Sequence, residues 1–148
     1  MIWPPPNNIS WYYSEPQTWF AGFKESIKFI KGSPRNISMN PENNNLIIDD
    51  LFQETNKYMV QLFTASSHHR NISIIFLTQH FFYKGPHRRN ISLNADYVVF
   101  FKNPRDKSQI FHLARQMYPD NANFLVEAYK DATCEPYSYL LIDLTPVV

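Results

Sequence analysis

The sequence predicts an α/β fold in which helices flank a mainly parallel sheet. Three apolar runs, at residues 46–48, 72–78 and 97–101, contain few polar interruptions, which is typical of strands buried on both faces of a parallel sheet. Segments whose apolar residues recur at helical spacing alternate with these runs, and that alternation favours the α/β class. A chain of 148 residues has the length of one ordinary domain, so we expect a single domain over residues 1–148.

The composition excludes a disordered chain. Aromatic residues make up 16% of the sequence and charged residues 18%, whereas disordered chains are poor in aromatics and rich in net charge. No apolar stretch approaches the roughly 18 residues of a membrane span, and the start of the chain lacks the pattern of a signal peptide. The lone Cys134 suits a reducing compartment. We therefore expect an intracellular protein of the cytoplasm or nucleus that is not secreted.

The N-terminal third predicts a strand, a helix and a loop. Residues 8–14 are aromatic and β-branched, as strands are. Ser14 and Gln17 have the spacing of a helix cap, and apolar residues at helical spacing follow up to Gly32, which predicts a helix near residues 16–31. The polar, proline-containing segment 33–45 predicts a loop.

The remaining elements follow from the same signals. After the strand at 46–48, we expect a helix near 53–67, a strand at 72–78, an irregular segment at 80–95 and a strand at 97–101. Asp106 and Gln109 form a cap pair for a helix that Pro119 ends. A further helix near 121–132 is expected to bury Phe124, Leu125, Ala128 and Tyr129, and a closing strand spans 137–144.

Polar residues follow two of the predicted strands. Asp49 and Asp50 end the strand at 46–48, and Gln79 ends the next one. In parallel sheets, functional residues gather at the carboxyl ends of strands. An acidic pair there can hold Mg²⁺ through its water shell and polarise an attacking water, and a glutamine can orient that water. The alternative is that the acids cap the next helix and that Gln79 is an ordinary surface residue.

Basic residues concentrate in one part of the chain. The segment 70–115 contains eight basic and only two acidic residues. Such a segment can face the phosphates of a nucleotide or of a nucleic acid, although an ordinary solvated surface has the same composition.

Residues 45–119 resemble the FtsK/HerA-type DNA-packaging ATPases of double-stranded DNA viruses and Maverick/Polinton-like elements. Residues 44–51 (NNLIIDDL) are similar to the Walker B strand of that family, and residues 67–80 to its next strand with the sensor glutamine. Residues 92–106 and 113–119 also resemble the family, and residues 3–6 and 11–15 fit its preceding strand and turn. The resemblance implies a P-loop NTPase (RecA/FtsK-like) core.

The resemblance assigns a role to each matching residue. Asp49 would hold Mg²⁺ through water, Asp50 would be the catalytic acid residue, and Gln79 the sensor of ATP. Arg70 would be an arginine finger acting on a neighbouring subunit of a homo-oligomeric ring, with Arg105 as a second candidate. Lys84, Arg88 and Arg89 would face double-stranded DNA.

The sequence departs from this family at one point. No G-x-x-x-x-G-K-[ST] segment occurs, because Gly22, Gly32 and Gly85 stand far apart. We therefore expect an incomplete core that lacks the N-terminal Walker A strand, loop and helix, and that does not hydrolyse ATP alone.

Two alternatives to the ATPase remain open. The chain could be a catalytically inactive remnant that acts as a DNA- or partner-binding module through the basic segment. A metal-dependent nuclease built on Asp49 and Asp50 would need further converging carboxylates. A zinc site formed by the five histidines and Cys134 has no recognised ligand spacing.

Overall fold

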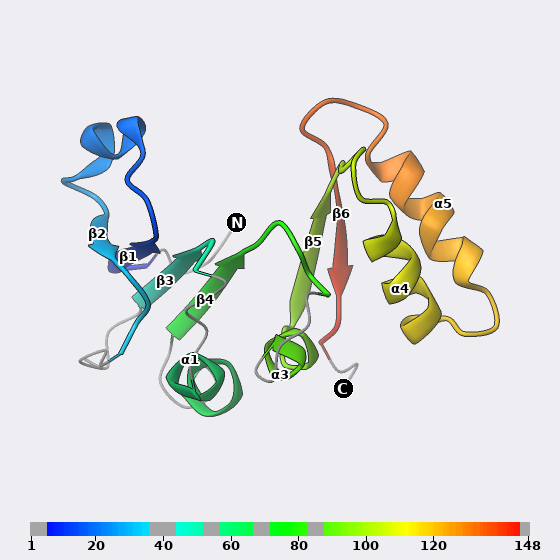
Figure 1. Cartoon of the computed structure of the whole chain (residues 1–148), viewed down its shortest axis with the longest axis horizontal. Coiled ribbons are helices and arrows are strands. Elements are labelled where there is room, and N and C mark those ends of the chain that lie inside the picture. The colour runs from blue at the N-terminus through cyan, green and yellow to red at the C-terminus, as the bar shows by residue number, and fades with distance from the viewer. Residues whose placement is uncertain (1–5, 36–43, 52–56, 67–71, 83–87, 146–148) are drawn as a thin grey trace. The chain divides into compact units, whose positions relative to one another are not determined.

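A computed structural model describes residues 6–35, 44–51, 57–66, 72–82 and 88–145. The chain divides into two compact units, residues 1–94 and 95–148, and Figure 1 labels the elements of both. Each unit has its own sheet and its own buried residues, so each is described by itself.

The first unit is built on a parallel sheet. Strands β1 (Asn8–Tyr13), β2 (Lys28–Lys31), β3 (Asn44–Asp49) and β4 (Ile72–Leu77) form four strands in the order β2-β1-β3-β4. All three neighbouring pairs are parallel. The predicted α/β class with a parallel sheet is therefore confirmed for this unit. Strands β3 and β4 lie where two of the apolar runs place them, and β1 lies where the aromatic and β-branched segment 8–14 predicts a strand.

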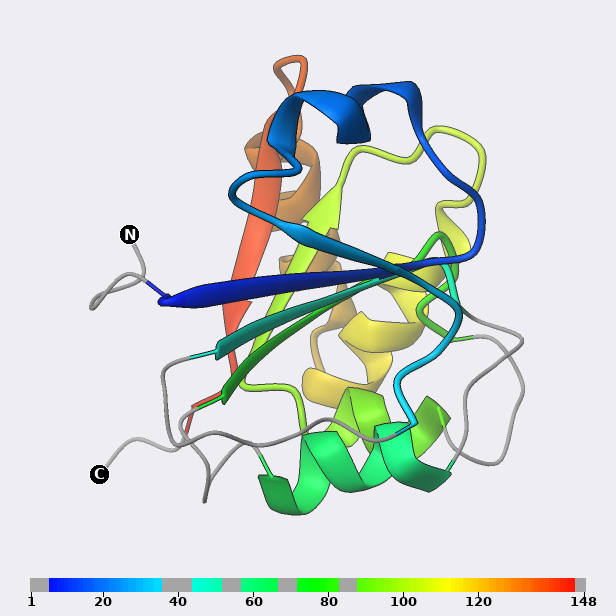
Figure 2. The ribbon, with the colours of Figure 1, turned by 90° about the vertical axis from the view of Figure 1, so that its left-hand side faces the viewer.

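Helices cover both faces of this sheet. Helix α1 (Lys57–Gln61), its π-helical continuation η3 (Leu62–Ser66) and helix α3 (Arg88–Leu93) lie on one face, and the 3₁₀ helix η1 (Thr18–Phe23) lies on the other (Figure 2). Because successive strand residues point to opposite faces, the residues that face α1 are every second one. The core on that face consists of Tyr12, Leu46, Ile48, Leu51, Met59, Leu62, Phe63, Ile72 and Ile91.

The helix predicted near residues 16–31 is wrong. Only η1 is helical there, Gln17 makes no side-chain cap bond, and the last part of the segment is strand β2. Residues 28–31 pair with β1 in parallel register, Ser10 lying opposite Lys28. The apolar spacing corresponds to a helix only over the six residues of η1. In residues 28–31, the hydrogen bonds to β1 stabilise a strand more than local propensity favours a helix.

Two further predictions in this unit need correction. The segment 80–95, expected to be irregular, contains helix α3, and the loop expected at 33–45 ends where β3 begins at Asn44. The helix expected near 53–67 is described from Lys57 to Ser66. Residues 36–43, 52–56 and 83–87 lie outside the described ranges.

The second unit pairs two strands with two helices. Strand β5 (Tyr97–Phe101) and strand β6 (Tyr139–Asp143) are antiparallel, with Val98 opposite Ile142. Helices α4 (Ser108–Met117) and α5 (Ala122–Ala132) connect them and pack against each other. The buried apolar residues of the unit are Val98, Ile110, Leu113, Ala114, Leu125, Val126 and Ile142.

Two predictions of which residues are buried in this unit are wrong. Strand β5 is not buried on both faces, because Tyr97, Val99 and Phe101 are all exposed and only alternate residues meet the core. Phe124 was expected in the core but is 54% exposed; Leu125 is buried as predicted, and α5 also buries Val126. An apolar run predicts a strand reliably, but it does not reveal how many of its faces are covered.

The cap pair before α4 is present in modified form. The amide Nε2 of Gln109 donates to Oδ2 of Asp106 at 2.9 Å, and Oδ1 of Asp106 accepts the backbone N–H of Ser108 at 3.1 Å. The two side chains thus contact each other, whereas a capping box joins each side chain to the other residue's backbone.

Candidate functional site

The carboxyl ends of three parallel strands meet at one edge of the first sheet. Tyr13 of β1 lies opposite Asp49 of β3, and Asp49 lies opposite Leu77 of β4. Asp50 directly follows the end of β3, and Gln79 lies two residues after the end of β4. The two acids and the glutamine singled out by the sequence therefore belong to neighbouring strand ends.

Asp49 is oriented by a tryptophan from the neighbouring strand. The Nε1–H of Trp11 donates to Oδ2 of Asp49 at 3.2 Å. Trp11 aligns with Ile47, two residues before Asp49, so both side chains lie on the sheet face opposite α1. One carboxylate oxygen of this half-buried residue is thus engaged, and the other is available to a water or an ion.

Asp50 adopts a backbone conformation that L-residues other than Asn and Asp seldom use. Its φ is 49°, and its N–H donates to the carbonyl of Leu77 at 3.2 Å. Ile48 and Leu51 are both fully buried in the same core. In a regular strand, residues three apart face opposite sides, so the left-handed turn at Asp50 is what returns Leu51 to the core and leaves Asp50 exposed.

Gln79 is the central residue of a tight turn that the hydroxyl of Thr78 stabilises. The hydroxyl of Thr78 donates to the carbonyl of His80 at 3.3 Å and accepts the His80 N–H at 3.2 Å. This turn ends β4 and leaves Gln79 exposed beside the strand end that bears Asp49. An exposed amide that follows the end of the neighbouring strand can orient a water or contact a phosphate.

Of the basic residues that the sequence singles out, the structure describes the side chain of Arg105 only. Arg70 and Lys84 lie outside the described residues. Arg88 and Arg89 begin helix α3, but their side chains are also outside the described part. Arg105 lies in the second unit and is exposed.

Among the described residues, the strand-end acids are the candidate ligands for a metal ion. Within the described ranges, no three or more His, Cys, Asp or Glu side chains gather as a metal cluster. A magnesium ion held mostly through its waters needs only one or two carboxylates plus substrate phosphates, and the half-buried Asp49 with the exposed Asp50 fits that donor set.

One contact of this site was missed at the level of sequence. Trp11 belongs to an aromatic stretch that indicates core packing or base stacking, and nothing in the chain order marks it as a partner of Asp49. Side chains alternate between the two faces of a strand. Once the register of β1 with β3 is known, this alternation places Trp11, Ile47 and Asp49 on the same face.

None of the helices in the described ranges combines the length and apolar character that a membrane-spanning helix requires.

Comparison with protein-family models, with curated proteins and with solved structures finds no match for this chain.

Proposed function

We propose that this chain is the C-terminal part of a viral or virus-like DNA-packaging ATPase that couples ATP hydrolysis to translocation of double-stranded DNA. The observation that supports the proposal is the placement of Asp49, Asp50 and Gln79 at the adjoining carboxyl ends of β3 and β4. In this role Asp49 holds Mg²⁺ through water, Asp50 polarises the attacking water, and Gln79 contacts the γ-phosphate or orients that water.

The character of β4 supports the same proposal. β4 is the last strand of its sheet, yet its sequence ISIIFL contains neither a charge nor a proline. Ile75 and Leu77, on the face opposite α1, are each 38% exposed. Edge strands usually bear lysine, proline or a bulge. In the proposed ATPase, the strand that leads into a Walker A loop pairs with this edge.

The proposal also assigns roles to the basic residues. Arg70 acts as the arginine finger on the nucleotide of a neighbouring subunit in a homo-oligomeric ring. Lys84, Arg88 and Arg89 contact the phosphates of DNA. ATP and Mg²⁺ are the cofactors, and both require a Walker A loop to cradle the phosphates.

Turnover in the full-length product of the reading frame tests the site. We expect Mg²⁺-dependent ATP hydrolysis stimulated by double-stranded DNA, and a loss of about 100-fold or more in Asp50→Asn, because a general base contributes about 10²–10⁴-fold. Gln79→Ala should lower turnover similarly while ATP still binds.

A matched control is Asp120→Asn, which neutralises an exposed carboxylate between α4 and α5. Its turnover should equal that of the parent protein. If Asp50→Asn hydrolyses ATP as fast as Asp120→Asn, the assignment of the site is wrong.

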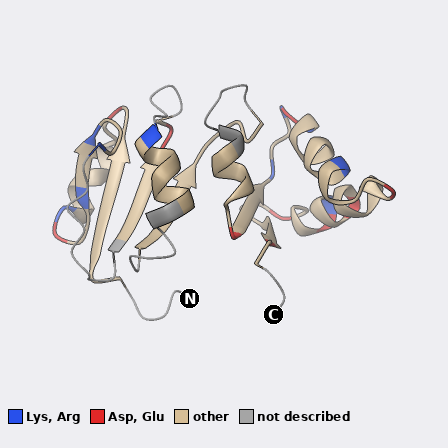
Figure 3. Cartoon of the chain, turned by 90° about the horizontal axis from the view of Figure 1, so that it is seen from below, with Lys and Arg blue, Asp and Glu red and all other residues tan. Residues whose placement is uncertain are grey.

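A non-enzymatic DNA-binding module is the second candidate function. Lys102, Arg105, Lys107 and Arg115 are exposed, and no carboxylate of the described residues forms an ion pair with them. Figure 3 shows basic residues along α4 and α5. Replacing Lys102, Arg105, Lys107 and Arg115 by Ala, like replacing Lys84, Arg88 and Arg89, should then weaken DNA binding and flatten its salt dependence. Salt-independent binding, or none, would remove this candidate.

A further inference from the structure

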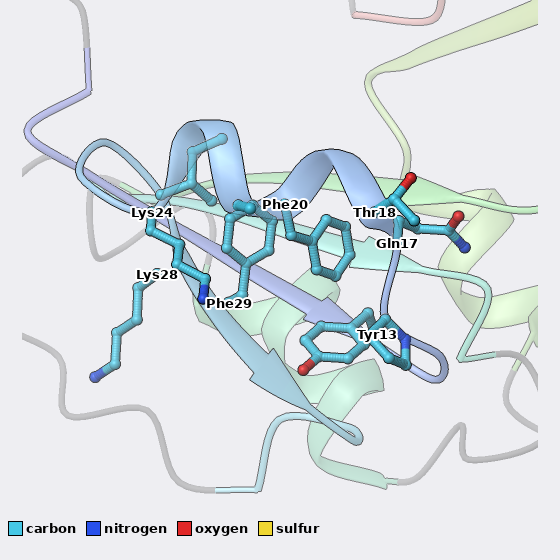
Figure 4. A pocket seen from close by; sticks show the side chains of 10 residues that line it. Tyr13, Gln17, Thr18, Phe20, Lys24, Lys28 and Phe29 are labelled. Atoms are coloured by element: carbon cyan, nitrogen blue, oxygen red, sulfur yellow. The ribbon is translucent and has the colours of Figure 1, made fainter.

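A groove lies between the crossover helix η1 and the β1–β2 edge of the first sheet. Its volume is about 540 Å³, within the range of small-molecule sites. Its lining combines three aromatic rings, two lysines and two uncharged polar side chains, and Figure 4 shows them from close by: Tyr13, Phe20 and Phe29; Lys24 and Lys28; Gln17 and Thr18.

The floor of the groove is a fixed aromatic surface. Phe29 stacks on Phe20 with ring centroids 4.1 Å apart and an interplanar angle of 15°, and Tyr13 meets Phe20 edge-on at 4.9 Å. Phe20 is only 5% exposed. Trp19 packs against the same pair at 4.7 Å and 5.9 Å. Phe20 is therefore covered, and a planar ligand can reach only the half-buried rings of Tyr13 and Phe29. Because their neighbours hold these rings in place, stacking on them costs little further conformational entropy.

One end of the groove is cationic. Lys24 and Lys28 lie on one side of the two phenylalanines, and Gln17 and Thr18 lie on the other (Figure 4). No carboxylate among the described residues forms an ion pair with Lys24 or Lys28; Glu15 pairs with Lys31 at 3.9 Å. Glu25 does not line the groove. An anionic group in this end therefore meets two ammonium groups without a competing acid.

We propose that this groove binds a nucleotide, with its base against the aromatic floor and its phosphate at Lys24 and Lys28. Bases stack on aromatic side chains irrespective of sequence, and an amide such as that of Gln17 can hydrogen-bond a base edge. The same chemistry is offered by a free nucleoside phosphate and by one unit of a single-stranded nucleic acid. The site uses none of Asp49, Asp50 and Gln79, so it is independent of the proposed ATPase.

Calorimetry and anisotropy on the 148-residue chain test the proposal. The probes are adenosine 5′-monophosphate, adenosine, inorganic phosphate and a fluorescein-labelled short oligothymidylate. We expect the monophosphate, the oligonucleotide or both to bind, and to bind more tightly than adenosine or phosphate. Binding of the monophosphate alone identifies a free nucleotide as the ligand, and binding of the oligonucleotide alone identifies a single strand.

Variants assign any binding to the groove. Lys24→Gln with Lys28→Gln should weaken binding about tenfold and reduce the salt slope of oligonucleotide binding by about 1 to 1.5. Phe29→Leu should weaken it about fivefold or more through lost stacking.

A control separates this site from exposed lysines elsewhere on the chain. Lys57→Gln removes an exposed lysine at the start of helix α1 and should change neither the affinity nor the salt slope. The proposal is overturned if no probe binds, if adenosine or phosphate binds as tightly as the monophosphate, or if the Lys24/Lys28 variant binds like the parent chain.

Discussion

The indole N–H of Trp11 donates a hydrogen bond to Oδ2 of Asp49 over a distance of 3.2 Å. This bond joins the candidate Mg²⁺ ligand to the aromatic cluster of η1 and β2, because Trp11 also packs against Trp19 at 5.1 Å and Phe29 at 6.3 Å. The orientation of the carboxylate thus depends on side chains that the proposed ATPase chemistry does not itself use.

A double-mutant cycle measures the Trp11–Asp49 bond. Hydrogen bonds to charged groups contribute about 1.5–3 kcal/mol, and because Asp49 is only half-buried we expect a coupling of about 1 kcal/mol between Trp11→Phe and Asp49→Ala in urea denaturation. The control cycle of Trp19→Phe with Asp49→Ala should couple by less than about 0.5 kcal/mol. Equal couplings in the two cycles would mean that the bond does not stabilise the fold.

The left-handed backbone at Asp50 predicts an unusual response to glycine. Asp50→Gly should be at least as stable as the parent chain, whereas Asp50→Val should lose about 1–2 kcal/mol, because a β-branched residue is strained at positive φ. Asp120 is not among the described residues with positive φ, so Asp120→Gly should lower stability. Chemical denaturation checks this; a destabilised Asp50→Gly would contradict the assigned geometry.

The hydroxyl of Tyr129 joins α5 to the end of β5, because it both donates and accepts a hydrogen bond there. The hydroxyl donates to the carbonyl of Phe101 at 3.0 Å and accepts the N–H of Asn103 at 2.9 Å. Tyr129→Phe leaves both backbone groups without this partner and should cost about 1–3 kcal/mol in thermal or urea unfolding. Tyr139→Phe removes the hydroxyl of a tyrosine that is 52% exposed and should be nearly neutral; similar losses in both variants would refute the bridge.

Two glycines should respond oppositely to alanine. A Cβ on Gly22 would meet no atom within 4 Å, so Gly22→Ala should raise the free energy of unfolding by about 0.5–1 kcal/mol by restricting the unfolded chain. Gly32 has a φ of 88° and donates its N–H to Tyr13 at 2.8 Å. Gly32→Ala should therefore lower stability by about 1–2 kcal/mol. Denaturation curves of the two variants that shift in the same direction would be inconsistent with these backbones.

Tyr12 makes stability sensitive to alkaline pH. Burial, and to a lesser extent the charge of Tyr58, raises the pKa of Tyr12 above its ordinary value. The folded state then retains the phenolic proton after the unfolded state has lost it, so stability is complete below pH of about 10 and is lost as pH rises through the raised pKa. Tyr12→Phe should flatten this decline in denaturation curves measured on either side of that pH. Parallel declines in parent and variant would show that Tyr12 is not its source.

Local composition predicts three of the four strands of the first unit, because each is a short segment rich in apolar, aromatic or β-branched residues. The segments 8–14, 46–48 and 72–78 each coincide with a strand. The segment 16–31 fails because Phe29 belongs to a strand that pairs with β1, while Phe20 belongs to a helical turn. The helical spacing of the apolar residues does not reveal that residues 28–31 pair with β1, because that pairing is a tertiary contact.

The candidate site divides in a similar way. The order of strands and acids places Asp49, Asp50 and Gln79 at strand ends, and the parallel register brings β3 and β4 side by side. The bond from Trp11 and the groove over Phe29 could not be predicted, because each requires the register of β1 with both of its neighbours.

The sequence by itself determined the parallel α/β architecture of the first unit and the chemical identity of its strand-end residues, because apolar runs and polar termini are local properties of the chain. Tertiary structure decided which face each side chain occupies. It turned Asp50 into a left-handed residue so that Leu51 could rejoin Ile48 in the core, and it exposed one face of β5. Such outcomes depend on which distant segments pair, and the free energy of that pairing and burial exceeds local conformational preference.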